Sequence, residues 1–175
     1  MTPPQFPAGE FQPEEVYGDE RRRELIGQIE AAPANLRAAV AGLSETDLNT
    51  PYKNWTVRQI VHHIADSHVN AYIRFKLTLT EERPTIKPYD EGLWAALPDS
   101  SAGDITPTLA LLDGLHRRWV ALLGTLTAEQ FGRAFYHPEY RETTTLSAAL
   151  AQYAWHGRHH TGQILWLRDQ RRLGM

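Results

Sequence analysis

The sequence predicts an all-α fold, a four-helix bundle. Four long segments carry apolar residues at spacings close to 3.6, the period of an α-helix, and no segment shows a convincing strand pattern. A long connection between the second and third segments predicts a crossover between those helices instead of a minimal up-and-down hairpin. At 175 residues the chain suits one domain with a substantial core, so residues 1–175 are predicted to form a single domain.

The first 43 residues divide into an arm and a helix. Residues 1–17 contain four prolines, two of them in tandem, and are expected to form an extended N-terminal arm. A helical pattern then runs over residues 19–43. Pro33 interrupts that pattern and predicts a kink or a break in the helix.

The second helix has the clearest start in the sequence. Thr56 is a good N-cap, and Gln59 three residues later completes a capping box. The helix is expected to reach about Thr80. Its apolar stripe consists of Val57, Ile60, Val61, Ile64, His68, Tyr72, Phe75 and Leu79.

Residues 82–106 hold three prolines and two glycines, a composition typical of a long connection, and such loops often carry function. The third helix is expected to begin near Thr106, because Pro107 then takes the favoured first helical position. Its apolar face consists of Leu109, Leu112, Leu115, Trp119, Leu122, Leu123 and Leu126.

The remainder of the chain is expected to close the bundle. Thr127 and Gln130 form another capping box, which predicts a short turn of helix. Residues 132–144 are expected to be irregular. The fourth helix is predicted over residues 146–172, ended by Gly174.

Composition excludes several classes of function. The net charge of −3 and the absence of a long run of one sign argue against nucleic acid or an anionic membrane as the partner. The chain has no cysteine, which excludes disulfides, Cys-ligated metals and a thiol nucleophile of its own. The N-terminal residues have no apolar core, so no signal peptide is expected, and no apolar run reaches the length of a membrane span. The expected location is the cytoplasm.

Histidines carry the strongest chemical signal. The chain has eight, and six of them fall in two clusters on the predicted second and fourth helices. The clusters are His62, His63 and His68, and His156, His159 and His160. His156 and His160 are four residues apart, so both imidazoles can point at one ion from the same helical face. The alternative is a pair of core histidines bonded to carbonyls or water.

Two histidines from one helix and one from another would give a three-nitrogen site. Imidazole suits zinc, nickel, copper and iron, and three protein ligands leave a position open for water or substrate. Helical phase nominates His68 as the third ligand, because it lies centrally on the apolar stripe while His62 and His63 flank it. A buried, hydrogen-bonded core role for His68 fits the pattern equally well.

Several motifs resemble the YfiT branch of the DinB-like superfamily. They are WTVRQIVHHIADSHVNAYIRFKLTLTEE at Trp55–Glu82, RPTIKPYDE ending at Glu91, FYHPE at Phe135–Glu139 and WHGRHH at Trp155–His160. The resemblance covers nearly the whole chain. It implies a four-helix bundle, a homodimer, and one zinc or nickel ion held by three histidines. The matching positions here are His63, His156 and His160, so the resemblance favours His63 over His68.

No general base is self-evident. Asp66, His68 and His159 are candidates, and Asp66 could also orient a ring N–H of His63 from one turn away. Arg74 could reach an anionic substrate from the same helix, although a surface charge is the more ordinary role for it.

Three functions agree with these observations. The resemblance implies a metal-dependent hydrolase acting on a small molecule, in which the ion activates water. The alternative is transfer of a low-molecular-weight thiol of the bacillithiol type, with the thiolate bound to the ion. The third is a non-catalytic metal-binding module of the stress response.

Overall fold

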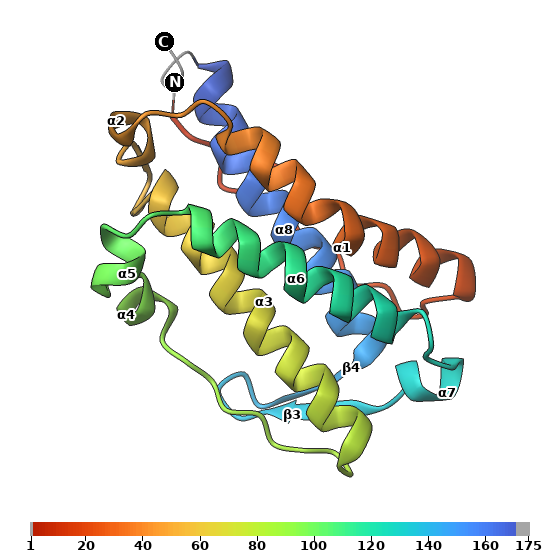
Figure 1. The fold of residues 1–175 in the computed structure, drawn as a ribbon. Helices are drawn as coiled ribbons and strands as arrows, with labels where there is room; N and C mark the ends of the chain where they lie inside the picture. Colours follow the sequence, from red (N-terminus) through yellow and green to blue (C-terminus); the bar gives the residue numbers. More distant parts are fainter. Residues whose placement is uncertain (1, 171–175) are drawn as a thin grey trace.

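The structure, a computed structural model, describes residues 2–170 and is a four-helix bundle, as predicted (Figure 1). The long helices are α1 (Asp19–Val40), α3 (Val57–Thr80), α6 (Thr106–Leu123) and α8 (Leu146–Asp169). Helices α1 and α3 each contact both α6 and α8, so the order around the bundle is α1, α6, α3, α8.

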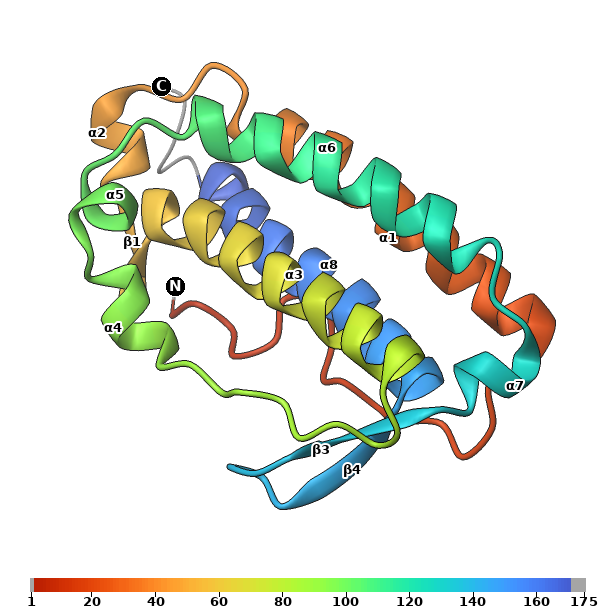
Figure 2. The ribbon, with the colours of Figure 1, turned by 60° about the horizontal axis from the view of Figure 1, so that its bottom comes forward.

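The connection between α3 and α6 is the predicted crossover. Figures 1 and 2 show α3 and α6 running in one direction and α1 and α8 in the other. Because α3 and α6 are parallel, the chain between them must travel back along the bundle. This segment is not a plain loop, since it contains the short helices α4 (Glu91–Ala95) and α5 (Pro98–Ser101).

Capping boxes define the start of three helices. The Thr56 side chain accepts a hydrogen bond from the Gln59 backbone N–H at the start of α3, as predicted. Thr127 and Gln130 do the same for α7 (Ala128–Phe131), again as predicted. Ser44 caps α2 (Glu45–Leu48) in the same way.

One predicted helix end differs from the structure, and another lies outside the described residues. Helix α1 ends at Val40, and Pro33 lies inside it without splitting it. The proline removes one hydrogen-bond donor from the helix, but its fixed φ is a helical value, so the helix can continue through it. Helix α8 extends to Asp169. The predicted end near Arg172 and Gly174 lies outside the described residues.

The prediction of an irregular segment over residues 132–144 was wrong. Strands β3 (Ala134–His137) and β4 (Glu142–Thr145) pair there as an antiparallel hairpin, and Ile86 of the crossover donates its backbone N–H to the Tyr136 carbonyl. A second, smaller hairpin joins β1 (Pro51–Tyr52) to β2 (Trp55–Thr56) directly before α3.

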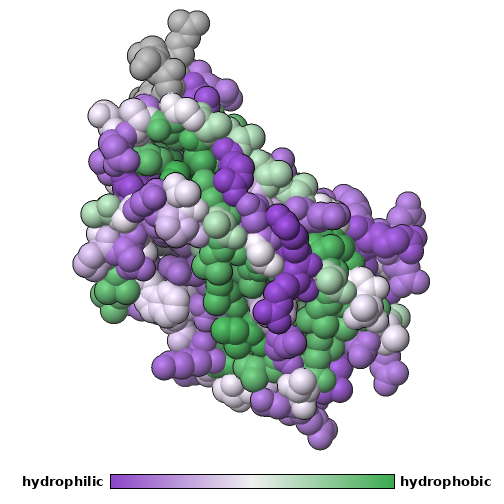
Figure 3. Space-filling view, in the orientation of Figure 1, coloured by the Kyte–Doolittle hydropathy of each residue, from purple (hydrophilic) through white to green (hydrophobic). Residues whose placement is uncertain are grey.

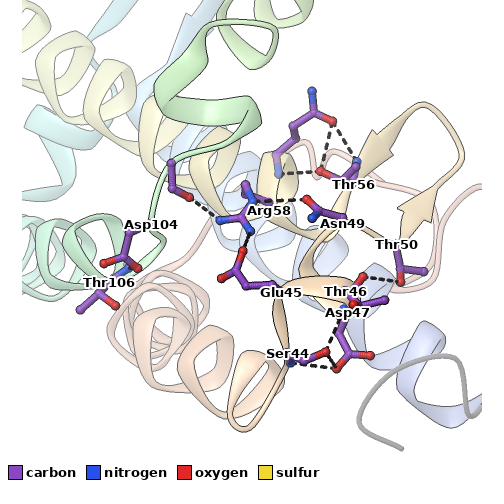
Figure 4. Close-up of polar contacts among 12 residues, drawn as sticks. Ser44, Glu45, Thr46, Asp47, Asn49, Thr50, Thr56, Arg58, Asp104 and Thr106 are labelled. Carbon is purple, nitrogen blue, oxygen red and sulfur yellow. Dashed lines mark hydrogen bonds and ion pairs between the residues drawn. The ribbon is translucent and has the colours of Figure 1, made fainter.

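Buried Arg58 fixes the start of α3 to its surroundings (Figure 4). Its guanidinium pairs with Glu45 of α2, donates to the Gly103 carbonyl after α5, and lies 3.5 Å from the Asn49 Oδ1 atom. These contacts tie the segments on both sides of α3 to its first turn, from which the histidine-bearing stretch of the helix follows.

The apolar core is divided by a layer of histidines. Along α3, Ile64 belongs to one buried cluster and Ala71 to another, and His68 lies between them. Along α6, Leu112 and Trp119 belong to the same two clusters on either side of His116. The bundle therefore has a polar layer between the two apolar clusters, which we call the histidine layer and which includes His68 and His116.

The face of the bundle drawn in Figure 3 carries apolar groups at its surface. Figure 3 shows hydrophobic surface along the course of α3, and the exposed apolar residues of the bundle include Ile73 of α3 and Leu111 of α6. Within residues 2–170, no helix combines the length and apolarity that a membrane span requires.

Candidate metal centre

Three histidines from two helices converge in the histidine layer. His63 of α3 and His156 and His160 of α8 each offer a ring nitrogen, and the three nitrogens lie within 4.8 Å of one another. The Nε2 atoms of His63 and His156 are 3.1 Å apart. Two imidazole nitrogens bound to one tetrahedral zinc would be about 3.3 Å apart, so the donor set fits a transition metal ion.

Burial keeps these histidines uncharged. Desolvation, with a smaller contribution from the nearby His159, lowers the pKa of His63 to about 4. Desolvation and the nearby His63 lower the pKa of His160 to about 3. The pKa of His156 is also lowered well below its ordinary value, first by burial and then by the surrounding histidines. Neutral imidazoles present the lone pairs that metal coordination requires.

Hydrogen bonds hold two of the rings from behind. The Nδ1 atom of His160 lies 2.9 Å from the Gln163 Oε1 atom, and Nδ1 of His156 lies 3.3 Å from Nε2 of His68. Both Nδ1 atoms are thus engaged, which leaves both Nε2 atoms for the centre. Trp55 covers the group, with its ring centroid 4.5 Å from that of His63 and 6.2 Å from that of His160.

His68 is a buried, hydrogen-bonded residue behind the centre, as one of its two predicted roles required. Its second nitrogen, Nδ1, lies 2.8 Å from Nε2 of His116. Helical phase therefore identified a residue of the site, but one that supports a candidate ligand. Helical phase did not nominate His63, because His63 lies at the edge of the apolar stripe, where it faces α8 and Trp55.

The other two candidate bases occupy different positions. Asp66 is half-buried, and within residues 2–170 its carboxylate is not a hydrogen-bond partner of His63. Burial, reinforced by Asp99, raises the pKa of Asp66 to about 6. His159 stacks on Trp155 and is linked to His160 through Gln163, whose Nε2 lies 3.2 Å from Nε2 of His159.

His62 does not join the group, because its Nδ1 atom lies 2.8 Å from the Thr108 hydroxyl of α6. Sequence reasoning missed His116 and Gln163. Gln163 follows His160 by three residues on one helix, and that spacing was the available signal. His116 stands alone in an apolar stripe, so nothing local identified it.

A cavity of about 140 Å³ adjoins His156. Arg74 lines it and donates through Nη1 to the Tyr153 hydroxyl at 2.8 Å. The buried Nε atom of Arg74 and Nδ1 of His137 have no hydrogen-bond partner in the described part of the chain. Exposed carboxylates also line the cavity, those of Glu91, Glu139 and Glu142.

The chain is similar to known proteins over nearly its whole length. The model of the DinB superfamily matches residues 28–164. A Bacillus subtilis (strain 168) protein named "Putative metal-dependent hydrolase YfiT" is 51% identical over 171 residues, which cover 97% of this chain and 95% of the relative. A similarly named protein of Bacillus cereus is 48% identical over 172 residues, covering 97% of this chain and 98% of that relative.

The fold is also similar to a solved structure. The structure described as "YfiT from Bacillus subtilis is a probable metal-dependent hydrolase with an unusual four-helix bundle topology" superimposes with a TM-score of 0.93 at 50% identity. The match covers 95% of this chain and 96% of that one. By sequence and by fold, the chain belongs to the DinB superfamily.

Proposed function

We propose that the protein is a hydrolase of a small molecule that depends on one zinc or nickel ion held by His63, His156 and His160. The observation that carries the proposal is the convergence of three uncharged imidazoles from two helices beside a cavity. Three protein ligands are the pattern of catalytic rather than structural zinc, which is normally closed by a fourth. The names of the relatives support metal dependence and hydrolysis.

In such a centre the metal would supply a Lewis acid that polarises the substrate and lowers the pKa of water to about 7. Among the candidate bases we propose Asp66. It lies one turn after His63 on α3, and its raised pKa of about 6 leaves it ionised yet basic at neutral pH. Both ring nitrogens of His68 are already engaged by histidines.

The cavity beside His156 would bind part of the substrate. A volume of about 140 Å³ is small, because sites for whole ligands usually span about 300–1,000 Å³. It therefore suits one polar end of a substrate. An arginine with an unpartnered Nε atom favours a planar carboxylate there, and the exposed acids that also line the cavity disfavour a larger anionic surface.

Arg74→Met tests this assignment. The change should raise KM for a carboxylate-bearing substrate about tenfold to a hundredfold, the value of a charge-assisted hydrogen bond, and leave KM of the matching carboxamide unchanged. Equal effects on both substrates would contradict carboxylate recognition.

The central experiment compares metal-free protein with protein reloaded with zinc or nickel on a panel of small esters and amides. Activity should require the metal and disappear in His63→Phe, while His62→Phe, the neighbouring histidine that faces α6, should keep it. Consumption of an electrophile only when a low-molecular-weight thiol is added would replace hydrolysis by thiol transfer. Metal removal that unfolds the chain, with no reactivity in either assay, would favour a non-catalytic module.

We also propose a homodimer, as the family resemblance implies. The exposed apolar side chains of α3 and α6 are compatible with a partner on that face. Light scattering of the full chain should give twice the chain mass of 19.9 kDa. A mass of one chain would reject the dimer without touching the metal centre.

A further inference from the structure

A line of hydrogen bonds crosses the bundle from the candidate metal ligand His156 to the backbone of α1. Nδ1 of His156 lies 3.3 Å from Nε2 of His68, and Nδ1 of His68 lies 2.8 Å from Nε2 of His116. Nδ1 of His116 lies 2.6 Å from the carbonyl oxygen of Ile29. The line uses one residue from each long helix, and His68 and His116 are only 0% and 2% exposed.

Pro33 explains why the Ile29 carbonyl can end this line. In an α-helix the carbonyl of a residue accepts the N–H of the residue four positions later. The residue four positions after Ile29 is Pro33, which has no N–H, although α1 continues through it. A buried carbonyl without its helical donor needs another partner, and His116 provides it.

The carbonyl sets the direction of every bond in the line. It can only accept, so His116 must carry its proton on Nδ1 and accept at Nε2. His68 must then donate from Nδ1 and accept at Nε2, and His156 must donate from Nδ1. The lone pair of His156 is left on Nε2, the atom that faces His63. No carboxylate takes part in the line.

We propose that the Ile29 carbonyl, freed by Pro33, fixes the tautomer of His156 through His116 and His68, which makes these two histidines positioning residues for a metal ligand. Metal-bound histidines usually donate their other ring N–H directly to a carboxylate, carbonyl or water. Here the carbonyl is two rings away. The two histidines between His156 and the carbonyl are neutral, so they place no negative charge near the ion, as a carboxylate would. The metal end of the inference rests on the proposed function, whereas the tautomers do not.

The first test uses the unaltered, metal-free protein. Nitrogen-15 NMR of the imidazole rings distinguishes a proton on Nδ1 from one on Nε2. We expect the Nδ1–H form for His116, His68 and His156. An Nε2–H form for any of the three would overturn the inference, whether or not the protein binds metal.

The second test removes the outer ring of the line. In His116→Phe, zinc affinity measured by competition with a chelator should fall about tenfold or more, the usual effect of losing a group that orients a ligand, and His156 should lose its fixed tautomer. His62→Phe is the matched control, because it removes another buried histidine that bonds to α6, and both properties should stay unchanged. An unchanged His156 tautomer and zinc affinity in His116→Phe would overturn the inference.

Pro33→Ala separates positioning from packing. The new N–H competes with His116 for the Ile29 carbonyl, so zinc affinity should fall about fivefold, the value of roughly one hydrogen bond. The midpoint of thermal unfolding of the metal-free protein should not fall with it, because α1 gains a helical bond. An unchanged zinc affinity would show that the proline has no part in the line. Failure of the unaltered protein to bind zinc would instead reject the proposed function and leave the NMR result standing.

Discussion

The histidines of the candidate centre are chemically unusual because burial has already removed their protons. A histidine with an ordinary pKa of 6.5 is mostly protonated at pH 6, so three such ligands would release about two protons on binding a metal ion. In this chain burial lowers the pKa of His63 to about 4 and of His160 to about 3, and His156 is lowered as well.

Zinc uptake at pH 6 should therefore release almost no protons. Isothermal titration calorimetry in two buffers of different ionisation enthalpy measures the number directly. A release of about two protons would show that the ligands are charged in the metal-free protein, and that the centre forms only when the ion arrives.

Asp66 should weaken the metal-free protein at neutral pH. A carboxyl whose pKa is raised in the folded state, here from 3.8 to about 6, is destabilising when ionised, and this penalty disappears as the pH falls through 6 toward 3.8. Because Asp66 is half-exposed, solvent screening reduces the penalty to about 1 kcal/mol. Asp66→Asn should raise the free energy of unfolding by that amount at pH 7.5.

The same pair of proteins at pH 4.5 is the control, since most of the difference should be lost there. Chemical denaturation of the metal-free proteins at both pH values measures it. A difference that does not depend on pH would show that packing, not ionisation, distinguishes the two. In the metal-loaded protein the substitution should also abolish hydrolysis if Asp66 is the base.

At the scale of single helices, local sequence patterns predicted where a helix starts better than they predicted contacts between distant segments. The Thr56 cap fixed the first residue of α3 because both partners lie within three residues. The β3–β4 hairpin was not predicted, because each strand has only four residues, too few for an alternation of apolar and polar residues to stand out. Its hydrogen bond with Ile86 also depends on the folded crossover.

The candidate site divides in the same way. The pair His156 and His160 could be predicted because a four-residue spacing is local. The family resemblance identified His63. The partners of His116 could not be predicted, since they lie 48 and 87 positions away along the chain and one of them is a backbone carbonyl freed by a proline.

The cap of α3 should have a measurable energy. In Thr56→Ala the Gln59 N–H loses its acceptor, and the free energy of unfolding should fall by about 1 kcal/mol. Thr80→Ala, at the other end of the same helix, removes an exposed hydroxyl that donates to the Lys76 and Leu77 carbonyls, and it should cost less. Denaturant titration of both variants makes the comparison. Equal losses would mean that the N-terminal cap has no special role.

For the whole molecule, the histidine layer should couple metal binding to folding. The layer divides the two apolar clusters, and its candidate ligands come from α3 and α8, which neighbour each other around the bundle. An unfolded chain cannot hold the three nitrogens together, so zinc should bind the folded state far better. Free zinc at 1,000 times its dissociation constant should then add about 4 kcal/mol to the free energy of unfolding.

Thermal unfolding at increasing free zinc tests this coupling. The midpoint should rise with zinc concentration in the unaltered protein and in His62→Phe, and should stay nearly constant in His63→Phe and His160→Phe. Phenylalanine keeps an aromatic ring at each position, and the zinc-dependent shift of each variant is measured from its own metal-free midpoint. A zinc-dependent rise that survives in His63→Phe would place the ion elsewhere and would remove the centre on which the hydrolase proposal depends.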